Sequence, residues 1–222
     1  MKKKIAILTL ALGLTTASYA QFGGMMGGGG GGAGGDVGAQ VEAFNKDALI
    51  IREAMANALT QLTYAFGDQK SIAAAKTQAE NLAKTTDTKE IGNIQGSIIK
   101  DQEAAMAEAL SGDAAKAKMA KLAPEMQKKI AQSIFNVAIS ALKIPESIKK
   151  GQGIIQSVGS NPMQLPKVLP VKDGISMFAD ALPNLPKIVT AGLQLVKGAG
   201  ITPENATATS TVVQIKPELP PE

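Results

Sequence analysis

The chain has 222 residues, of which 45% are hydrophobic and 19% charged, with a formal net charge of +4. This composition is sufficient for one domain with an apolar core, and the absence of Cys and His excludes disulfides, thiol nucleophiles, Cys-bound zinc and Ser-His-Asp triads. Aromatic residues make up only 3% of the chain, which favours closely packed helices over a sheet.

The first 20 residues have the pattern of a Sec-type signal peptide. Three lysines precede an apolar stretch, and the segment ends in Ser18-Tyr19-Ala20, which predicts cleavage before Gln21. The apolar stretch of about ten residues is too short for a bilayer, which needs about 20. We therefore expect an exported protein, periplasmic or secreted, and not a lipoprotein, because there is no Cys to acylate. Removing these lysines leaves a net charge of about +1, which argues against nucleic-acid binding.

Residues 21–35 contain ten glycines. Glycine loses the most backbone entropy on folding, so we expect a flexible tether here. The glycines do not predict a phosphate-binding loop, because no strand precedes them.

From Asp36, a candidate helix cap, apolar residues recur at helical spacing. The clearest pattern alternates intervals of three and four residues, as in an a/d seam. It comprises Val41, Phe44, Ala48, Ile51, Met55, Ala58, Leu62 and Ala65. Further helices are expected over 68–84, after Asp87, over 113–123 and over 124–144, the last ending before Pro145 because proline disrupts a helix interior. The sequence thus predicts an all-α fold, with an elongated antiparallel helical bundle over residues 36–144.

The composition of the chain changes at Pro145. Residues 145–201 contain six prolines, which predict short helices in a Pro-broken, basic C-terminal subdomain packed against the bundle. Residues 141–201 carry seven lysines and three acidic residues, a balance that attracts acidic partners or anionic lipid. Residues 202–222 are rich in Thr, Pro and Glu, and we expect a disordered tail there.

An uncharged polar stripe lies on the helix predicted over residues 124–144. It comprises Gln132, Ser133, Asn136 and Ser140. Because buried polar groups need hydrogen-bond partners, the stripe predicts either hydrogen bonds between helices of the bundle or the lining of a ligand cavity or docking groove.

The segment Leu185–Val196 is strongly amphipathic. Apolar residues recur at helical spacing on one side of the predicted helix. The opposite side carries Lys187 and, directly after the segment, Lys197. This pattern is typical of a helix whose apolar face packs on the bundle. The alternative is a helix that docks on a partner or on an anionic membrane surface.

Two kinds of pattern in the sequence resemble parts of catalytic sites. Ser97 and Lys100, and likewise Ser147 and Lys150, match Ser-x-x-Lys, but the Ser-Asp-Asn and Lys-Thr-Gly motifs that accompany it in penicillin-binding proteins are absent. Carboxylates at positions 101, 103 and 108 fall on the predicted polar side of one helix, where we expect solvent exposure. No cofactor-binding, metal-binding or catalytic set is therefore predicted.

These observations favour an exported, non-enzymatic bacterial protein with a structural or protein-interaction role in the cell envelope. Its expected partner is a protein, with an anionic membrane surface as a further possibility, and the oligomeric state is left open. The first alternative is a membrane-active or lipid-binding helical protein. The second is an exported hydrolase that uses Ser and Lys or carboxylates.

Overall fold

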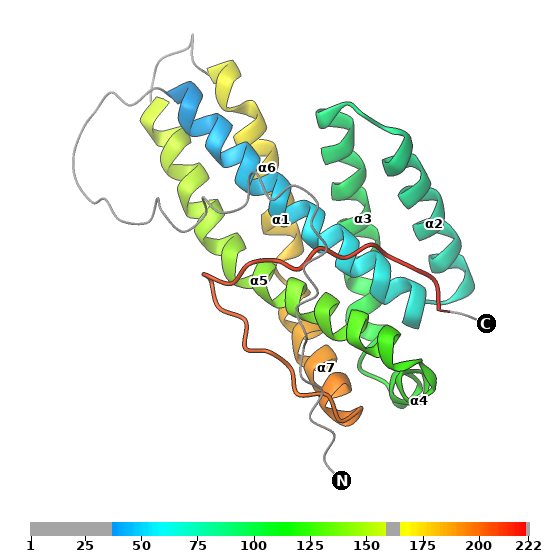
Figure 1. The fold of residues 1–222 in the computed structure, drawn as a ribbon. Coiled ribbons are helices and arrows are strands. Elements are labelled where there is room, and N and C mark those ends of the chain that lie inside the picture. The colour runs from blue at the N-terminus through cyan, green and yellow to red at the C-terminus, as the bar shows by residue number, and fades with distance from the viewer. Residues whose placement is uncertain (1–36, 159–164, 221–222) are drawn as a thin grey trace, which may run out of the picture. The chain divides into compact units, whose positions relative to one another are not determined.

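The computed structural model describes residues 37–158 and 165–220 (Figure 1). Within these ranges the chain forms seven α-helices and one short 3-10 helix, with no strand, and the helices pack antiparallel. The all-α prediction is confirmed. The expected signal peptide, the glycine-rich segment and Asp36 lie outside the described residues.

Helix α1 (Val37–Phe66) forms over the predicted apolar seam. All eight seam positions from Val41 to Ala65 are buried, and Ile51 is only 2% exposed. The helix ends at Phe66, and the N–H of the following Gly67 donates to the carbonyl of Thr63 at 2.8 Å. Burial of this stripe supplies most of the stability that a long helix needs, since propensity alone contributes little.

Helices α2 (Gln69–Lys84), α3 (Thr88–Ala109) and α4 (Asp113–Lys121) follow. The carboxylates of Asp68 and Asp87 cap α2 and α3, accepting hydrogen bonds from the backbone N–H groups of Ser71 and Glu90 at 2.7 and 2.8 Å. Such caps satisfy N–H groups that have no partner within the helix. These boundaries agree with those predicted from the sequence.

We expected a helix that ends before Pro145, and this prediction is wrong. Helix α5 (Pro124–Val158) continues for 13 residues beyond the proline. Proline removes one backbone donor and crowds the preceding turn. The ring of Pro145 is exposed, whereas Ile144, Ile154 and Val158 are buried on either side of it. The helix therefore continues because its apolar stripe remains packed on both sides of the proline.

The C-terminal helices are short. The 3-10 helix Leu165–Val168 leads into α6 (Leu169–Ala181), and α7 (Leu185–Gly198) follows; α6 and α7 each carry a proline in the first turn, where a missing N–H costs nothing. Both pack on α5 and α3. Phe178 and Leu195 belong to the same apolar core as Phe44 and Ile134, so a single core joins the residues before and after Pro145.

The segment after α7 is extended and lies on the helices, which corrects the expectation of a disordered tail. The chain leaves α7, reverses at a turn between Thr207 and Ser210, and runs back across α5 toward the end of α1 (Figure 1). Residues 211–220 are named here the C-terminal strap. Its Ile215 is buried, at 7% exposure, and its backbone is bonded to two helices. These long-range contacts order a segment whose composition resembles a tail.

Candidate functional site

The C-terminal strap is held by two buried side-chain amides from different helices. Asn136 lies on α5 and Gln61 on α1, and both are fully buried. With the nearby Lys129 they form what we call the strap site. A buried amide costs free energy if its donors and acceptor are unmatched, so this site requires an extended chain or another partner of similar polarity.

Asn136 binds the strap through its main chain. Its Nδ2 donates to the carbonyl oxygen of Val213 at 2.7 Å, and the backbone N–H of Val213 donates to Oδ1 at 2.8 Å. One side-chain amide thus pairs with both polar groups of a single residue. Because these bonds go to the main chain, they do not depend on which side chain stands at position 213.

Gln61 repeats this arrangement five residues further along the strap. Its Nε2 donates to the carbonyl oxygen of Glu218 at 3.0 Å, and the N–H of Glu218 donates to Oε1 at 2.8 Å. The same Nε2 lies 3.3 Å from the sulfur of Met126. The two amides therefore hold the strap at two points along its length.

Two side chains of the strap make further contacts with the helices. Ile215 is buried midway between the two amide contacts. The carboxylate of Glu218 forms an ion pair with Lys129, and this pairing holds the pKa of Glu218 below its usual value. Because Glu218 is largely exposed, the pair favours an acidic residue at this position without contributing much stability.

The other residues of the polar stripe behave differently from Asn136. Ser133 and Ser140 are buried, and their hydroxyls donate to carbonyl oxygens four residues earlier in α5, those of Lys129 and Asn136, at 2.8 and 2.9 Å. Gln132 is half-buried. The serines therefore donate their hydrogen bonds within the helix, and among the described residues Asn136 is the member of the stripe that forms hydrogen bonds with a distant segment of the chain.

The amphipathic helix predicted from the sequence is α7, and its apolar face lies in the core. Leu185, Ile188, Leu195 and Val196 are all buried, while Lys187 and Lys197 are exposed. The two lysines are accessible, but the apolar face proposed to accompany them in docking is covered by other helices of the same chain.

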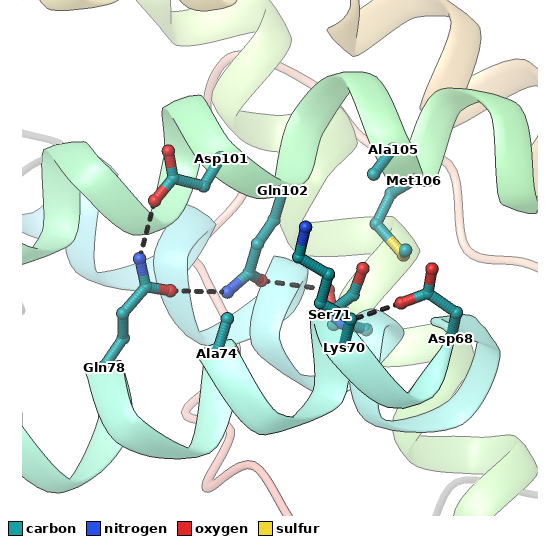
Figure 2. Close-up of a pocket in the computed structure, with 10 residues that line it drawn as sticks. Asp68, Lys70, Ser71, Ala74, Gln78, Asp101, Gln102, Ala105 and Met106 are labelled. Atoms are coloured by element: carbon teal, nitrogen blue, oxygen red, sulfur yellow. Dashed lines mark hydrogen bonds between the residues drawn. The ribbon is translucent and has the colours of Figure 1, made fainter.

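A pocket of about 320 Å³ lies between α2 and α3, beside the end of α1 (Figure 2). A relay of hydrogen bonds crosses it. Thr63 donates to Gln102, Gln102 to Gln78, and Gln78 to the carboxylate of Asp101, at 2.8–3.1 Å. Because these polar groups are matched to one another, the relay acts as a connection between the helices.

The candidate catalytic residues are not assembled into a reactive site. Ser97 and Lys100 are exposed on α3. Lys150 forms an ion pair with Asp47 at 2.8 Å, and this contact does not involve Ser147, the residue that it would have to activate. No group of three or more metal-ligating side chains occurs in the described part of the chain, and none of the helices described there is long and apolar enough to cross a membrane.

Glu103 lies in the interior, although we expected it on a solvated face. It is 7% exposed on α3. Its Oε1 accepts a hydrogen bond from Asn184 at 3.3 Å, whereas Oε2 has no partner among the described residues. Burial raises the pKa of this carboxyl group; the Asn184 bond lowers it, and the nearby Asp180 raises it further.

We expect Glu103→Gln to stabilise the fold at neutral pH. A carboxyl group whose pKa is raised in the folded state stabilises the folded protein below the unfolded pKa, near 4.5. This stabilisation is lost as the pH rises through the folded pKa, because the buried group must then carry a charge. The gain from the substitution should therefore grow between about pH 4 and pH 7. Urea unfolding at several pH values measures it.

Glu108→Gln is the matched control for this prediction, because it removes the same charge from an exposed position on the same helix. We expect no comparable change in the urea midpoint. A pH-independent difference between Glu103→Gln and the unsubstituted protein would contradict the assignment.

Comparison with known proteins finds no family model, no curated protein and no solved structure that matches this chain. The function is therefore inferred from the geometry of the strap site. Gln61 was not predicted from the sequence. It lies near the C-terminal end of α1, where the helix is buried on all sides. A signal was present for the strap, since Val213 and Ile215 alternate with polar residues as in a half-buried extended segment.

Proposed function

We propose that this is an exported, non-enzymatic helical protein whose role is to bind another protein, and that the strap site is where it holds an extended polypeptide. The observation that carries the proposal is the pair of buried amides, Gln61 and Asn136, each bonded to both main-chain groups of one strap residue. Extended peptides are commonly recognised in this way, by main-chain hydrogen bonds with side-chain pockets between them.

A protein partner is favoured over a lipid surface. The apolar face of α7, on which the lipid-binding alternative depended, is packed against the side chain of Ile134. The strap site, in contrast, already contains a polypeptide. The exposed positions of Ser97 and Lys100 also give no support to the hydrolase alternative, since an activated lysine needs desolvation or a charged neighbour.

The proposal predicts site-dependent crosslinking in the native envelope. A photo-crosslinking amino acid in place of Gln132, on the same side of α5 as Asn136, should form an adduct with another polypeptide. The adduct should be lost when Asn136→Ala is added. The same group in place of the exposed Lys84 on α2 is the control. An adduct that persists with Asn136→Ala, or one that forms only within the chain, would contradict the proposal.

Export predicts a defined N-terminus. Protein recovered from a host that recognises the signal should begin at Gln21, or at its pyroglutamate form, because of the Ser18-Tyr19-Ala20 site. Intact mass spectrometry decides this. Retention of residues 1–20 in such a host would overturn the exported part of the proposal.

A further inference from the structure

We propose that the C-terminal strap is an internal ligand that a partner displaces, and that the partner segment shares its chemistry. That segment is extended and carries a branched apolar residue followed three positions later by a carboxylate, as Ile215 and Glu218 do here. This inference rests on the proposed function, and it names the ligand and the regulation of the strap site.

The chemistry of the ligand follows from what the strap site contacts. Asn136 and Gln61 bond the main chain at residues 213 and 218, a spacing that an extended chain covers in about 16 Å. Between these points only Ile215 is buried, and the charged contact is that of Lys129 with Glu218. A segment from another polypeptide that matches these features makes every contact that the strap makes.

The strap is also built so that it can leave the site as a unit. Within the described part of the chain, residues 202–206, which connect the strap to the helices, form no hydrogen bonds and include no buried side chain. The turn at Thr207–Ser210 is closed by its own bonds, including the N–H of Ser210 to the carbonyl of Thr207 at 3.0 Å. Detachment of the strap therefore breaks only the contacts made by the strap itself.

Detachment leaves two amides without their partners, so the site favours exchange of one chain for another over an empty state. The tethered strap competes at an effective concentration of about millimolar. An external peptide must overcome this competition, so its apparent affinity is weakened in the intact protein. Weakening the strap should restore the affinity without any change to the helices.

The test uses the full chain carrying Ile215→Asp and Glu218→Lys, together with a fluorescent peptide of residues 209–220 in the unsubstituted sequence. Anisotropy should show that the peptide binds this strap variant at least about tenfold more tightly than it binds the unsubstituted protein. Binding should disappear when Asn136→Ala is added, with helix content checked by circular dichroism. Failure of the peptide to bind a folded strap variant, or equal binding to both proteins, would overturn the inference.

A charge exchange provides a second readout that does not disturb the core. Lys129 is partly exposed, so Lys129→Glu should fold in a protein whose strap carries Ile215→Asp alone, which leaves no lysine at position 218 of the strap to pair with the new glutamate. It should weaken binding of the original peptide and favour a peptide carrying Glu218→Lys, most clearly at low salt. If both proteins prefer the same peptide, the assigned orientation of the ligand is wrong.

The two proposals fail in different ways. Crosslinking at residue 132 that depends on Asn136, combined with no peptide binding to the strap variant, overturns displacement and leaves the proposed function standing. Peptide binding combined with no crosslinked polypeptide overturns the proposed function. Dimers joined by exchanged straps, detected by sedimentation, would overturn the assignment of the ligand to a different protein.

Discussion

Ile51→Asp is expected to unfold the helical core at neutral pH. Ile51 is 2% exposed in the middle of α1, surrounded by apolar residues. An unpaired carboxylate at such a position costs several kcal/mol, which is a large part of the roughly 5–15 kcal/mol that stabilises a typical domain. Far-UV circular dichroism and thermal unfolding measure the loss of helix and cooperativity.

Leu142→Asp is the matched control for this substitution. It introduces the same charge into the long helix α5, but Leu142 is 47% exposed. We expect its effect to stay within about 1 kcal/mol, since most surface substitutions change stability by about 0.5 kcal/mol or less and the lower helix propensity of aspartate adds a few tenths of a kcal/mol. A cooperative and stable Ile51→Asp protein would show that this face of α1 does not lie in the core.

Gly192→Val should destabilise the packing of α7 on α5. A Cβ at Gly192 would lie 2.2, 2.8 and 3.0 Å from three side-chain carbons of Ile134, which is fully enclosed. The whole isoleucine side chain, and not only its tip, would have to move. Overpacking of this kind costs typically 1–3 kcal/mol, and valine adds two methyl groups to the clash, so we expect about 3 kcal/mol or more in urea unfolding.

Gly198→Val separates the clash from the effect of valine on helix propensity. Gly198 lies at the end of the same helix, and a Cβ there meets nothing within 4 Å. We expect little change, or a small gain from the loss of glycine's backbone entropy. Equal losses from the two substitutions would mean that α7 does not approach α5 as closely as the structure shows.

Most of the helical fold was predictable because its determinants are local. The seam of α1 repeats over about 25 positions, and the caps at Asp68 and Asp87 bond to N–H groups only three residues away. Such features appear in any short window of sequence. The all-α class and the starts of α2 and α3 follow from them.

The features that were missed depend on contacts across long stretches of chain. Continuation of α5 through Pro145 depends on packing with other helices, which outweighs the local penalty of proline. The strap is ordered by bonds to residues 77 and 157 positions earlier. Burial of Glu103 depends on where α7 places Asn184, and no pattern within α3 reveals it.

Of the candidate site, the sequence indicated the polar stripe but not its partner. The stripe predicted hydrogen bonds between helices or a lining for a ligand, and Asn136 instead bonds an extended segment of the same chain. Gln61 was overlooked because polar residues in an amphipathic helix are ordinarily assigned to solvent. Near the end of α1, however, Thr60, Gln61 and Thr63 are all buried.

The separation of 157 residues between Gln61 and Glu218 also has a consequence during protein synthesis. A ribosome adds about 5–20 residues per second, so Gln61 emerges about 8–30 seconds before Glu218. Asn136, which completes the pair of amides, precedes Val213 by 77 residues and emerges about 4–15 seconds before it. During that interval the nascent chain presents its amides with no tethered competitor. If the proposed partner segment is present where the chain folds, it would meet the site before the strap does, so the order of synthesis would favour the partner in addition to its affinity.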